Sequence, residues 1–600
     1  MKLSKLNELP TSRDMISVFG GYNHNLRISE GEFYDMTNLT SADYPVLSPR
    51  PKRGIYASPT KPTGLIAKDA LCYVDGDDFV INGYKVNMGL NNEPKTLISM
   101  GAYVIIMPDK KYISTQKNEA DDAFEHGNIE AEAVIDSGTV KFSLCKVDGT
   151  AFKNKRTDSE GKEIEEDVPS GAIAPDSPNN LDYWIDTSST PCVLKQYSSN
   201  SSQWSSVATT YIKISYSNIG KAFEVNDGVT ISGITIESLK DLNNTMIVWD
   251  KDDDYIVVTG ILERESTQEA TAANPIKIER RMPNMDFIIE SGNRLWGCRY
   301  GLALNGEVVN EIYASKLGDF KNWHCYAEIS TDSYAATVGT DGQFTGAVTH
   351  MGYPIFFKEN YMHKVYGNYP ANYQIQTTAC RGVQKGCSKS LAIVNETLYY
   401  KSRSAVCAYD GSLPVEISSA LGDVSYSDAV AGVLGNKYYI SMKDAVGEYH
   451  LFVYDALKGM WHREDNTQAV EFCNCRGNLY YIDYDDNKIR SVIGEGSLDT
   501  TRVEWSAETG FIGTDSPDKK YISRLVVRLS LELGTSVVFS IEYDSLGTWE
   551  HLFTMDGTCL KTFSIPIRPK RCDHLRLRID GKGEAKIFSI TKTIEQGSDT

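Results

Sequence analysis

Three stretches of the sequence repeat one phrase and decide the fold: residues 392–400 (AIVNETLYY), 433–440 (VLGNKYYI) and 473–482 (CNCRGNLYYI). Each starts with small or apolar residues, continues through Gly or Asn, and ends in an aromatic-rich run. Gly and Asn accept the positive φ of a tight hairpin, and the aromatic run fits a half-buried strand. Tyr399 to Tyr439 spans 40 residues and Tyr439 to Tyr480 spans 41, the length of a propeller blade of four short strands. The sequence therefore predicts an all-β protein centred on a β-propeller.

Similar strand–turn–strand units occur earlier in the chain, centred on residues 71–76, 101–106, Trp296 and Phe356. Counting them gives about six to eight blades, within the range that natural propellers use. We divide the chain into five parts: an extended N-terminal arm (1–55), the opening propeller blade or blades (56–116), an inserted β-rich module (117–240), the main β-propeller (241–495) and a C-terminal β-sandwich or jelly roll (496–600).

The N-terminal arm is predicted from its prolines, because three of them within residues 44–51 exclude a helix. Its apolar residues are too few for a core of their own and too many for a free tail. We expect them to be buried, either on the protein's own propeller or on a neighbouring subunit. They are Phe19, Tyr22, Leu26, Phe33, Tyr34, Met36 and Leu39.

The two other non-propeller parts differ in pattern. Residues 153–180 are polar and loop-like, and the aromatic phrase at 180–187 (NLDYWIDT) follows them. Tyr183 and Trp184 in that phrase either form the core of a small β-module, the reading we favour, or stack on sugars. Beyond residue 496, apolar and polar residues alternate with period two, as in 523–530 (SRLVVRLS), which predicts strands with one buried face.

Composition restricts the class of protein. The 600 residues carry a net charge of −19, which argues against tight binding of nucleic acid through its phosphates. The N-terminus lacks the apolar run of a signal peptide, and no stretch is apolar enough to span a membrane. The 12 cysteines are scattered, so we expect free thiols.

Several short motifs, in order, resemble the tail tubular protein B, or tail nozzle-like, family of bacteriophage virion propeller proteins. The first group lies in the arm, at 20–23 (GGYN), 31–32 (GE), 38–39 (NL) and 49–54 (PRPKRG). The second lies in the propeller, at 294–297 (RLWG), 310–323 (NEIYASKLGDFKNW), 352–358 (GYPIFFK), 408–411 (AYDG) and 454–464 (YDALKGMWHRE).

The resemblance implies a structural component of a bacteriophage tail, a nozzle or tail-tube-end protein found in the virion and made in the host cytoplasm. It implies a homo-oligomeric ring, a hexamer, that conducts DNA without binding it specifically. Neighbouring tail or adaptor proteins, and tail fibres, would be its partners, and it would have no membrane anchor. Two alternatives stay open: a carbohydrate-binding or glycan-degrading β-propeller protein, and a tail-fibre adaptor or baseplate protein.

No motif in the sequence predicts catalytic, cofactor-binding or metal-binding residues, so the expectation is a protein that is not an enzyme and needs no cofactor. Asp544–Trp549 resembles the Asp-box turn of sialidases, but a plain hairpin is favoured. The acids Asp252–Asp254 and Asp483–Asp486 suit Ca²⁺ less well than exposed turns. Cys473 and Cys475 lack the second pair that a zinc site needs, and His324 is expected to be a packed histidine.

Overall fold

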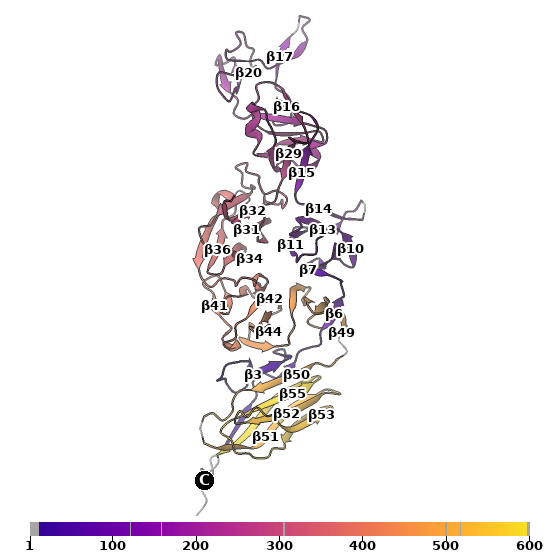
Figure 1. Cartoon of the computed structure of the whole chain (residues 1–600), viewed down its shortest axis with the longest axis vertical. Coiled ribbons are helices and arrows are strands. Elements are labelled where there is room, and N and C mark those ends of the chain that lie inside the picture. Colours follow the sequence, from indigo (N-terminus) through magenta and orange to yellow (C-terminus); the bar gives the residue numbers. More distant parts are fainter. Residues whose placement is uncertain are drawn as a thin grey trace, which may run out of the picture. The chain divides into compact units, whose positions relative to one another are not determined.

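The computed structural model describes residues 11–596 except 121, 158, 304–305, 499–500 and 516–517 (Figure 1). The chain forms two compact units. The first combines residues 1–97, 340–364 and 376–600, and the second combines 98–339 and 365–375. Within the described part of the chain, no helix has the length and apolar character needed to cross a membrane.

Among the described residues, seven four-stranded antiparallel sheets have the strand order of β-propeller blades, five in the first unit and two in the second. Both the propeller class and the expected range of blade numbers are confirmed. The three repeated phrases supply the first two strands of three successive blades. The blades are β7 (Pro62–Lys68), β8 (Ala70–Asp75), β9 (Asp78–Ile81) and β10 (Tyr84–Asn87); β11 (Thr96–Met100), β12 (Tyr103–Met107), β13 (Lys111–Lys117) and β14 (Phe124–Asn128); β30 (Phe287–Ser291), β31 (Arg294–Leu302), β32 (Val308–Ala314) and β33 (Tyr334–Thr337); β34 (Phe344–His350), β35 (Tyr353–Lys358), β36 (Tyr361–Tyr366) and β37 (Gln374–Ala379); β38 (Ala392–Val394), β39 (Thr397–Lys401), β40 (Val406–Tyr409) and β41 (Val415–Glu416); β42 (Ser427–Leu434), β43 (Lys437–Lys443), β44 (Tyr449–Asp455) and β45 (Met460–Arg463); β46 (Ala469–Cys475), β47 (Asn478–Asp483), β48 (Ile489–Ser491) and β6 (Gly54–Ala57).

The hairpins of the repeated phrases form for the expected reason. Asn395, Gly435 and Gly477 have φ of 47°, 56° and 79°, the left-handed region that Gly and Asn tolerate best. The aromatic strand after each turn is buried, and each strand has a tyrosine whose hydroxyl is hydrogen-bonded. The Tyr400 hydroxyl donates to the Arg381 carbonyl at 2.6 Å, and that of Tyr438 donates to the Ser390 carbonyl at 2.7 Å. These bonds remove the penalty of burying a polar group.

The seventh blade takes its fourth strand from the N-terminal segment. β6 pairs antiparallel with β48, so that Gly54 lies opposite Ser491. Only glycine fits there, because a Cβ on Gly54 would lie 2.0 Å from the carbonyl oxygen of Glu495. β49 (Ser497–Leu498) pairs with the other side of β6 and fixes it in the sheet. The blade therefore requires residues more than 400 positions apart.

The rest of the N-terminal segment is integrated into its own compact unit. Most of the apolar residues expected to be buried are buried there, with Tyr34 partly so; Leu26 is the exception at 81% exposed. The segment pairs with strands of a blade and of the C-terminal sandwich, so the protein's own fold accounts for this burial. Residues 1–10 lie outside the described part. Its strands are β1 (Thr11–Ile16), β2 (Gly21–Tyr22), β3 (Glu32–Thr37), β4 (Leu39–Thr40) and β5 (Ser48–Pro49).

The C-terminal residues form the expected β-sandwich, drawn in orange to yellow in Figure 1. One sheet has the order β1-β56-β51-β54. The other sheet has the order β3-β50-β55-β52-β53, and its strand β3 continues through β2 into the blade β42–β45. Leu525, Val527 and Leu529 are buried on one face of β51, as the period of two predicts. The strands are β50 (Glu504–Thr509), β51 (Lys520–Leu531), β52 (Ser536–Tyr543), β53 (Glu550–Asp556), β54 (Cys559–Ile565), β55 (Leu575–Lys582) and β56 (Ala585–Gln596).

The inserted β-rich module extends further along the chain than residue 240. β27 pairs with β23, and β29 pairs with both β15 and β24, so residues 245–280 belong to the sheets of the insert. A strand–turn–strand pattern looks the same in a blade and in a small barrel-like module, so the sequence pattern alone did not separate them. The strands are β15 (Ala131–Ile135), β16 (Gly138–Cys145), β17 (Lys153–Thr157), β18 (Glu163–Asp167), β19 (Ser170–Gly171), β20 (Tyr183–Asp186), β21 (Val193–Ser198), β22 (Gln203–Ser206), β23 (Tyr211–Ser215), β24 (Gly228–Ser232), β25 (Thr245–Ile247), β26 (Asp250–Asp252), β27 (Tyr255–Thr259), β28 (Ser266–Ala270) and β29 (Ile276–Arg280).

The helical segments of the described chain are short 3-10 turns between strands. They are η1 (Ile219–Ala222), η2 (Glu237–Leu242), η3 (Pro370–Asn372), η4 (Ser388–Ser390) and η5 (Ser419–Leu421).

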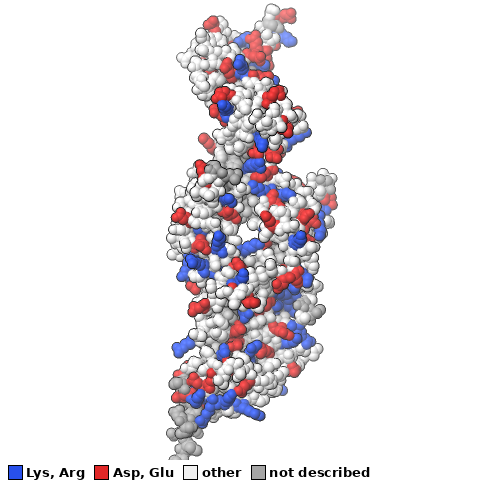
Figure 2. Space-filling view, viewed as in Figure 1, with Lys and Arg blue, Asp and Glu red and all other residues white. Residues whose placement is uncertain are grey.

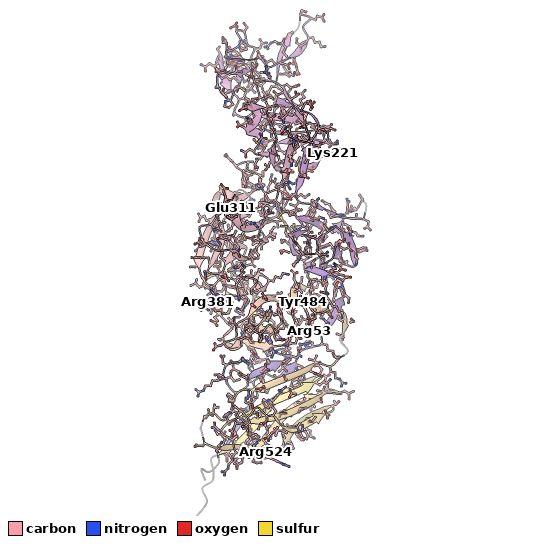
Figure 3. All side chains as sticks on the ribbon, viewed as in Figure 1. Arg53, Lys221, Glu311, Arg381, Tyr484 and Arg524 are labelled. Carbon is pink, nitrogen blue, oxygen red and sulfur yellow. The ribbon has the colours of Figure 1, made fainter. Side chains whose placement is uncertain are left out.

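Buried ion pairs attach the N-terminal segment to the propeller. Arg53, labelled in Figure 3, is 7% exposed, and its guanidinium contacts Glu464 at 2.9 Å and Asp465 at 3.0 Å. Arg50 contacts the same two carboxylates, at 3.7 Å and 3.1 Å. Removing one partner of such a group leaves an uncompensated buried charge, which is more damaging than the loss of an exposed pair.

We predict that Arg53→Met lowers the free energy of unfolding by about 3–5 kcal/mol, because Glu464 and Asp465 would lose their closest cation. Arg381→Met is the control, since Arg381 and Glu416 form a pair whose side chains are 55% and 42% exposed. That control should change stability by less than about 1 kcal/mol. Urea denaturation followed by intrinsic fluorescence measures both, and equal effects of the two variants would contradict the role of Arg53.

Two histidines are buried in their neutral form in this unit. His363 lies between two hydroxyls, with 2.9 Å from Nε2 to Thr340 Oγ1 and 2.9 Å from Nδ1 to Thr377 Oγ1. Burial, helped by the nearby Lys358 ammonium, lowers the pKa of His363 to about 4. Burial also lowers the pKa of His462 to about 3, with Lys437 acting in the same direction. Both imidazoles therefore stay neutral in the folded protein well below the usual range of a histidine.

This predicts a loss of stability in acid. The unfolded chain binds protons at these histidines near pH 6.5, whereas the folded chain binds them only near its lower pKa. Between these pH values the proton favours the unfolded state, so the free energy of unfolding falls as the pH drops. Each should lower the free energy of unfolding by about 1.4 kcal/mol per pH unit in that range. His363→Gln should reduce the slope between pH 6 and pH 4.5 by this amount, measured by urea denaturation at stepped pH. The exposed His126, changed to Gln, serves as control, and an unchanged slope in His363→Gln would refute the account.

Candidate functional site

The acidic clusters considered as calcium sites are satisfied by neighbouring protein groups. In the turn between β26 and β27, Asp254 accepts a hydrogen bond from the Asn218 amide at 2.8 Å and Asp252 accepts one from the Asp253 amide. Asp483 and Asp486 contact Arg490 at 2.9 Å and 2.6 Å. Across the described residues, no group of three or more His, Cys, Asp or Glu side chains is arranged to hold a metal ion.

The cysteine and histidine candidates belong to packed regions. Cys473 and Cys475 lie on β46 as free thiols, and burial raises the pKa of the Cys473 thiol above its usual value. Neither is therefore poised as a thiolate. His324 is partly buried, and burial lowers its pKa, as expected of a packed histidine.

The Asp-box-like segment is a hairpin turn between β52 and β53, as predicted. Asp544 and Ser545 have φ of 49° and 52°, and Gly547 has φ of 72°. The Ser545 hydroxyl contacts His574 Nε2 at 2.7 Å. These contacts hold the turn against the sandwich.

The aromatic pair of the insert is divided between two faces of β20. Tyr183 packs edge-on against Phe152, with ring centroids 5.0 Å apart. Trp184 is buried against Trp204 at 5.5 Å, and its indole N–H donates to the Gly171 carbonyl. The two rings therefore serve the cores of the module and do not form one exposed platform for a sugar.

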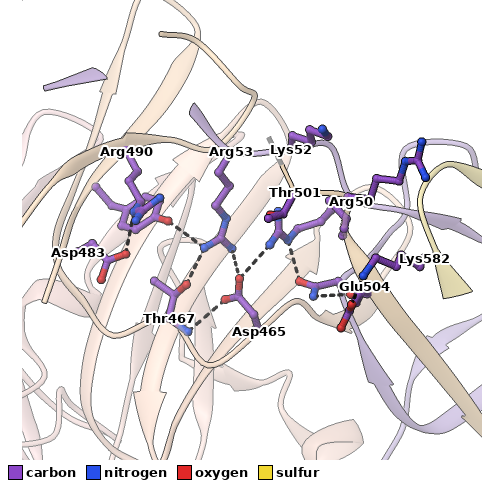
Figure 4. Close-up of a pocket in the computed structure, with 14 residues that line it drawn as sticks. Arg50, Lys52, Arg53, Asp465, Thr467, Asp483, Arg490, Thr501, Glu504 and Lys582 are labelled. Carbon is purple, nitrogen blue, oxygen red and sulfur yellow. Dashed lines mark hydrogen bonds and ion pairs between the residues drawn. The ribbon is translucent and has the colours of Figure 1, made fainter. Parts of the chain in front are cut away.

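A cavity lies where the N-terminal segment meets the seventh blade and the sandwich, all within the first compact unit (Figure 4). Its volume is about 510 Å³. Six cationic side chains line it against three carboxylates, and Glu464 and Asp486, outside the lining, pair with Arg53 and Arg490. We call it the cationic pocket. The cations are Arg50, Lys52, Arg53, Arg490, Arg502 and Lys582, and the carboxylates are Asp465, Asp483 and Glu504.

One wall of the cationic pocket is held by Arg53. Its Nη1 donates to the Tyr481 hydroxyl at 2.9 Å and to Thr467 Oγ1 at 2.5 Å. Although burial opposes ionisation of Asp465, the Arg53 and Arg50 guanidiniums hold the pKa of that carboxyl below its usual value. Among the described residues, the buried Nε of Arg53 has no hydrogen-bond partner. The wall is thus rigid and charged, and it retains an unused donor.

A second carboxyl in the pocket is shifted in the opposite direction. Burial raises the pKa of Asp483, although Arg490 lies 2.9 Å from its carboxylate. The pKa values of the two carboxyls are thus shifted in opposite directions, as those of an acid and a base in one site are, while Asp483 stays paired with Arg490.

The remaining cations of the lining are less buried than Arg53. Lys582 pairs with Glu504 at 2.7 Å, and Arg502 donates to the Gly534 carbonyl. Within the described part of the chain, the Lys52 ammonium makes no hydrogen bond or ion pair. Among the described residues, Lys52 and Arg502 are therefore the cations of the pocket that have no carboxylate partner.

The sequence contains a signal for this pocket, in the cations of residues 49–54 (PRPKRG). From the sequence alone we assigned no site to those cations. The partners come from residues 465–504 and 582, and no local pattern connects them to the N-terminal segment. Only the pairing of β6 with β48 brings them together.

Neither a family model nor a curated protein matches the sequence. Among solved structures, one described as a glycoside hydrolase matches with 12% identity and a TM-score of 0.20, covering 50% of this chain and 96% of that chain. The exo-β-1,3-galactanase of Phanerochaete chrysosporium matches with 9% identity and a TM-score of 0.19, covering 51% and 94%. Trypanosoma rangeli sialidase matches with 10% identity and a TM-score of 0.16, covering 74% and 95%.

These matches correct the main functional expectation from the sequence. The expected bacteriophage tail component, and the expectation of no enzymatic activity, are overturned because the matched structures are carbohydrate-active enzymes and not tail proteins. Short aromatic and glycine motifs follow from the demands of blade hairpins, so they do not distinguish one class of propeller from another. At this identity the likeness concerns the fold alone and transfers no substrate or catalytic residue to this chain.

Proposed function

We propose that the protein is a carbohydrate-binding β-propeller protein whose cationic pocket binds a sugar that carries a carboxylate. The observation that carries the proposal is that Lys52 and Arg502, two of the six cations lining a pocket of about 510 Å³, form no ion pair among the described residues. That volume lies within the range of small-molecule sites, roughly 300–1,000 Å³. Guanidinium groups bind carboxylates through paired hydrogen bonds, which gives both affinity and orientation.

The neutral groups of the pocket suit the rest of such a sugar. Asn38, Thr467 and Tyr481 line the same cavity and offer amide and hydroxyl groups. A sugar presents several hydroxyls that must be hydrogen-bonded when they leave water. The combination of a cationic end and a polar neutral wall therefore favours an acidic sugar over a simple inorganic anion.

A second, related function follows from the opposed shifts of Asp465 and Asp483. Hydrolysis of a glycosidic bond uses two carboxyls, one protonated to assist the leaving group and one ionised. Burial keeps the pKa of Asp483 raised, which suits the acid, and Arg53 with Arg50 keeps Asp465 ionised. In this role Asp483 would donate its proton to the glycosidic oxygen.

The test is binding of purified protein to a glycan array that contains sialylated, uronate-containing and neutral members. We expect binding to the acidic members, weakened by raised salt because the attraction is electrostatic. The double variant Lys52→Gln/Arg502→Gln should weaken it at least about tenfold, a change of about 1.4 kcal/mol. Lys221→Gln/Arg381→Gln, which makes the same charge change at exposed sites outside the pocket, should leave it unchanged.

The same preparations test turnover with fluorogenic acidic glycosides. If the pocket hydrolyses its ligand, Asp483→Asn should abolish release of the fluorophore while binding on the array persists. Equal binding of neutral and acidic glycans, or identical behaviour of the two double variants, would overturn the assignment of the pocket. Binding without turnover would remove only the hydrolytic role of Asp483.

A further inference from the structure

The outer face of one sandwich sheet carries a row of arginines. The sheet has the order β1-β56-β51-β54, and its register places Arg13 opposite Thr593 and Thr593 opposite Arg524. Arg528 lies further along β51 on the same face, opposite Ser589. We call the surface defined by Arg13, Arg524 and Arg528 the arginine face; Figure 3 labels Arg524 on the sandwich.

The alternation of β51 explains why these arginines point outward. Leu525, Val527 and Leu529 are buried between the two sheets, so the residues between them face solvent. Arg524 and Arg528 are four positions apart with no register shift between them, so the period of two places both on the outward face. All three arginines are exposed. The sheet itself fixes their positions, so the face is prearranged.

The arginine face lacks the acids that neutralise most other cations of this protein. Among the described residues, no ion pair is formed by any of the three arginines. Among the described residues of these four strands, the carboxylate in the outward set is Glu595, at its end, and it accepts a hydrogen bond from the Tyr521 hydroxyl at 2.5 Å. Figure 2 shows Lys and Arg side chains gathered along the lower part of the sandwich, in contrast to the mixed charges elsewhere on the visible surface.

Small hydroxyl side chains flank the arginines on the neighbouring strands, and Val526 lies between Arg524 and Arg528 on β51. They belong to the same outward set in the register of the sheet. Adjacent strands lie about 4.8 Å apart, so Arg13 and Arg524 are separated by about 10 Å across β56. Arg524 and Arg528 are about 13 Å apart along the strand. The hydroxyls are those of Thr562, Ser564, Ser589, Thr591 and Thr593.

We propose that the arginine face binds a linear anionic polysaccharide, with sulfate or carboxylate groups along its length. Spaced guanidiniums would contact successive anionic groups, and the serine and threonine hydroxyls would hydrogen-bond to the sugar hydroxyls between them. This surface shares no residue with the cationic pocket. It goes beyond the proposed function, because it holds a polymer at a second place on the molecule.

The chemistry of the face favours a polysaccharide over nucleic acid. Tyr521 at its edge is the one aromatic residue in this outward set, so there is no series of rings on which bases would stack. A flat antiparallel sheet face also presents no element that enters a groove of duplex DNA. Away from this face the protein is strongly acidic, which repels a long, densely charged duplex.

The experiment measures binding of the full chain to a heparin octasaccharide, to polygalacturonate, to neutral dextran and to a 20-base-pair DNA duplex. We expect binding to one or both anionic polysaccharides and none to dextran. Arg524→Gln/Arg528→Gln should weaken that binding at least about tenfold, which corresponds to about 1.4 kcal/mol of binding free energy. Lys221→Gln/Arg381→Gln, with the same charge change elsewhere, and the pocket variant Lys52→Gln/Arg502→Gln should both leave it unchanged.

The melting temperature of each variant confirms that it is folded. If the double variant is unstable, Arg13→Gln on the edge strand β1 should also weaken binding of the anionic polysaccharide and provides an independent test. Tighter binding of the duplex than of either anionic polysaccharide, with loss in the same variants, would assign the face to nucleic acid and overturn the proposal. Loss in the pocket variant instead would assign the polymer to the cationic pocket. Absence of binding to every polyanion would also overturn it.

Discussion

The structure of the first compact unit depends on the ion pairs of Arg53 with Glu464 and Asp465. These groups are buried, and the cost of removing them from water is offset only while both signs are present. The pairs fix the segment immediately before β6, and β6 then supplies the fourth strand of the seventh blade. A polar interaction thus selects one register for a strand whose hydrophobic pattern alone would allow several.

The same attachment creates the cationic pocket. Arg50 and Arg53 arrive with the N-terminal segment, Asp465 and Asp483 belong to the blade, and Lys582 comes from the sandwich. The buried residues of the N-terminal segment, the sandwich and three blades of this unit form one hydrophobic cluster, and Tyr481 of the pocket belongs to a second one. The walls of the pocket are therefore held by packed cores, and its geometry is fixed before any ligand arrives.

Much of the fold was predictable from the sequence, because blades and sandwich strands are local patterns. The hairpins at Asn395, Gly435 and Gly477 and the alternation in β51 follow from rules that act over a few residues. The extent of the insert was not predictable, because the sequence pattern of a hairpin such as β26–β27 is the same in a propeller blade and in the inserted module. The pocket was missed for a different reason: Arg53 and Asp483 are 430 positions apart in the sequence, and only tertiary pairing unites them.

The completion of the last blade by an N-terminal strand has a consequence for synthesis. β6 leaves the ribosome early, while β48 is made more than 400 residues later. At a translation rate of about 5–20 residues per second, the edge formed by β6 waits about 20–90 s for its partner. An unpaired strand edge is a template for association with other chains. The nascent protein therefore passes through a period in which chaperones, more than its own contacts, determine whether it reaches the native state.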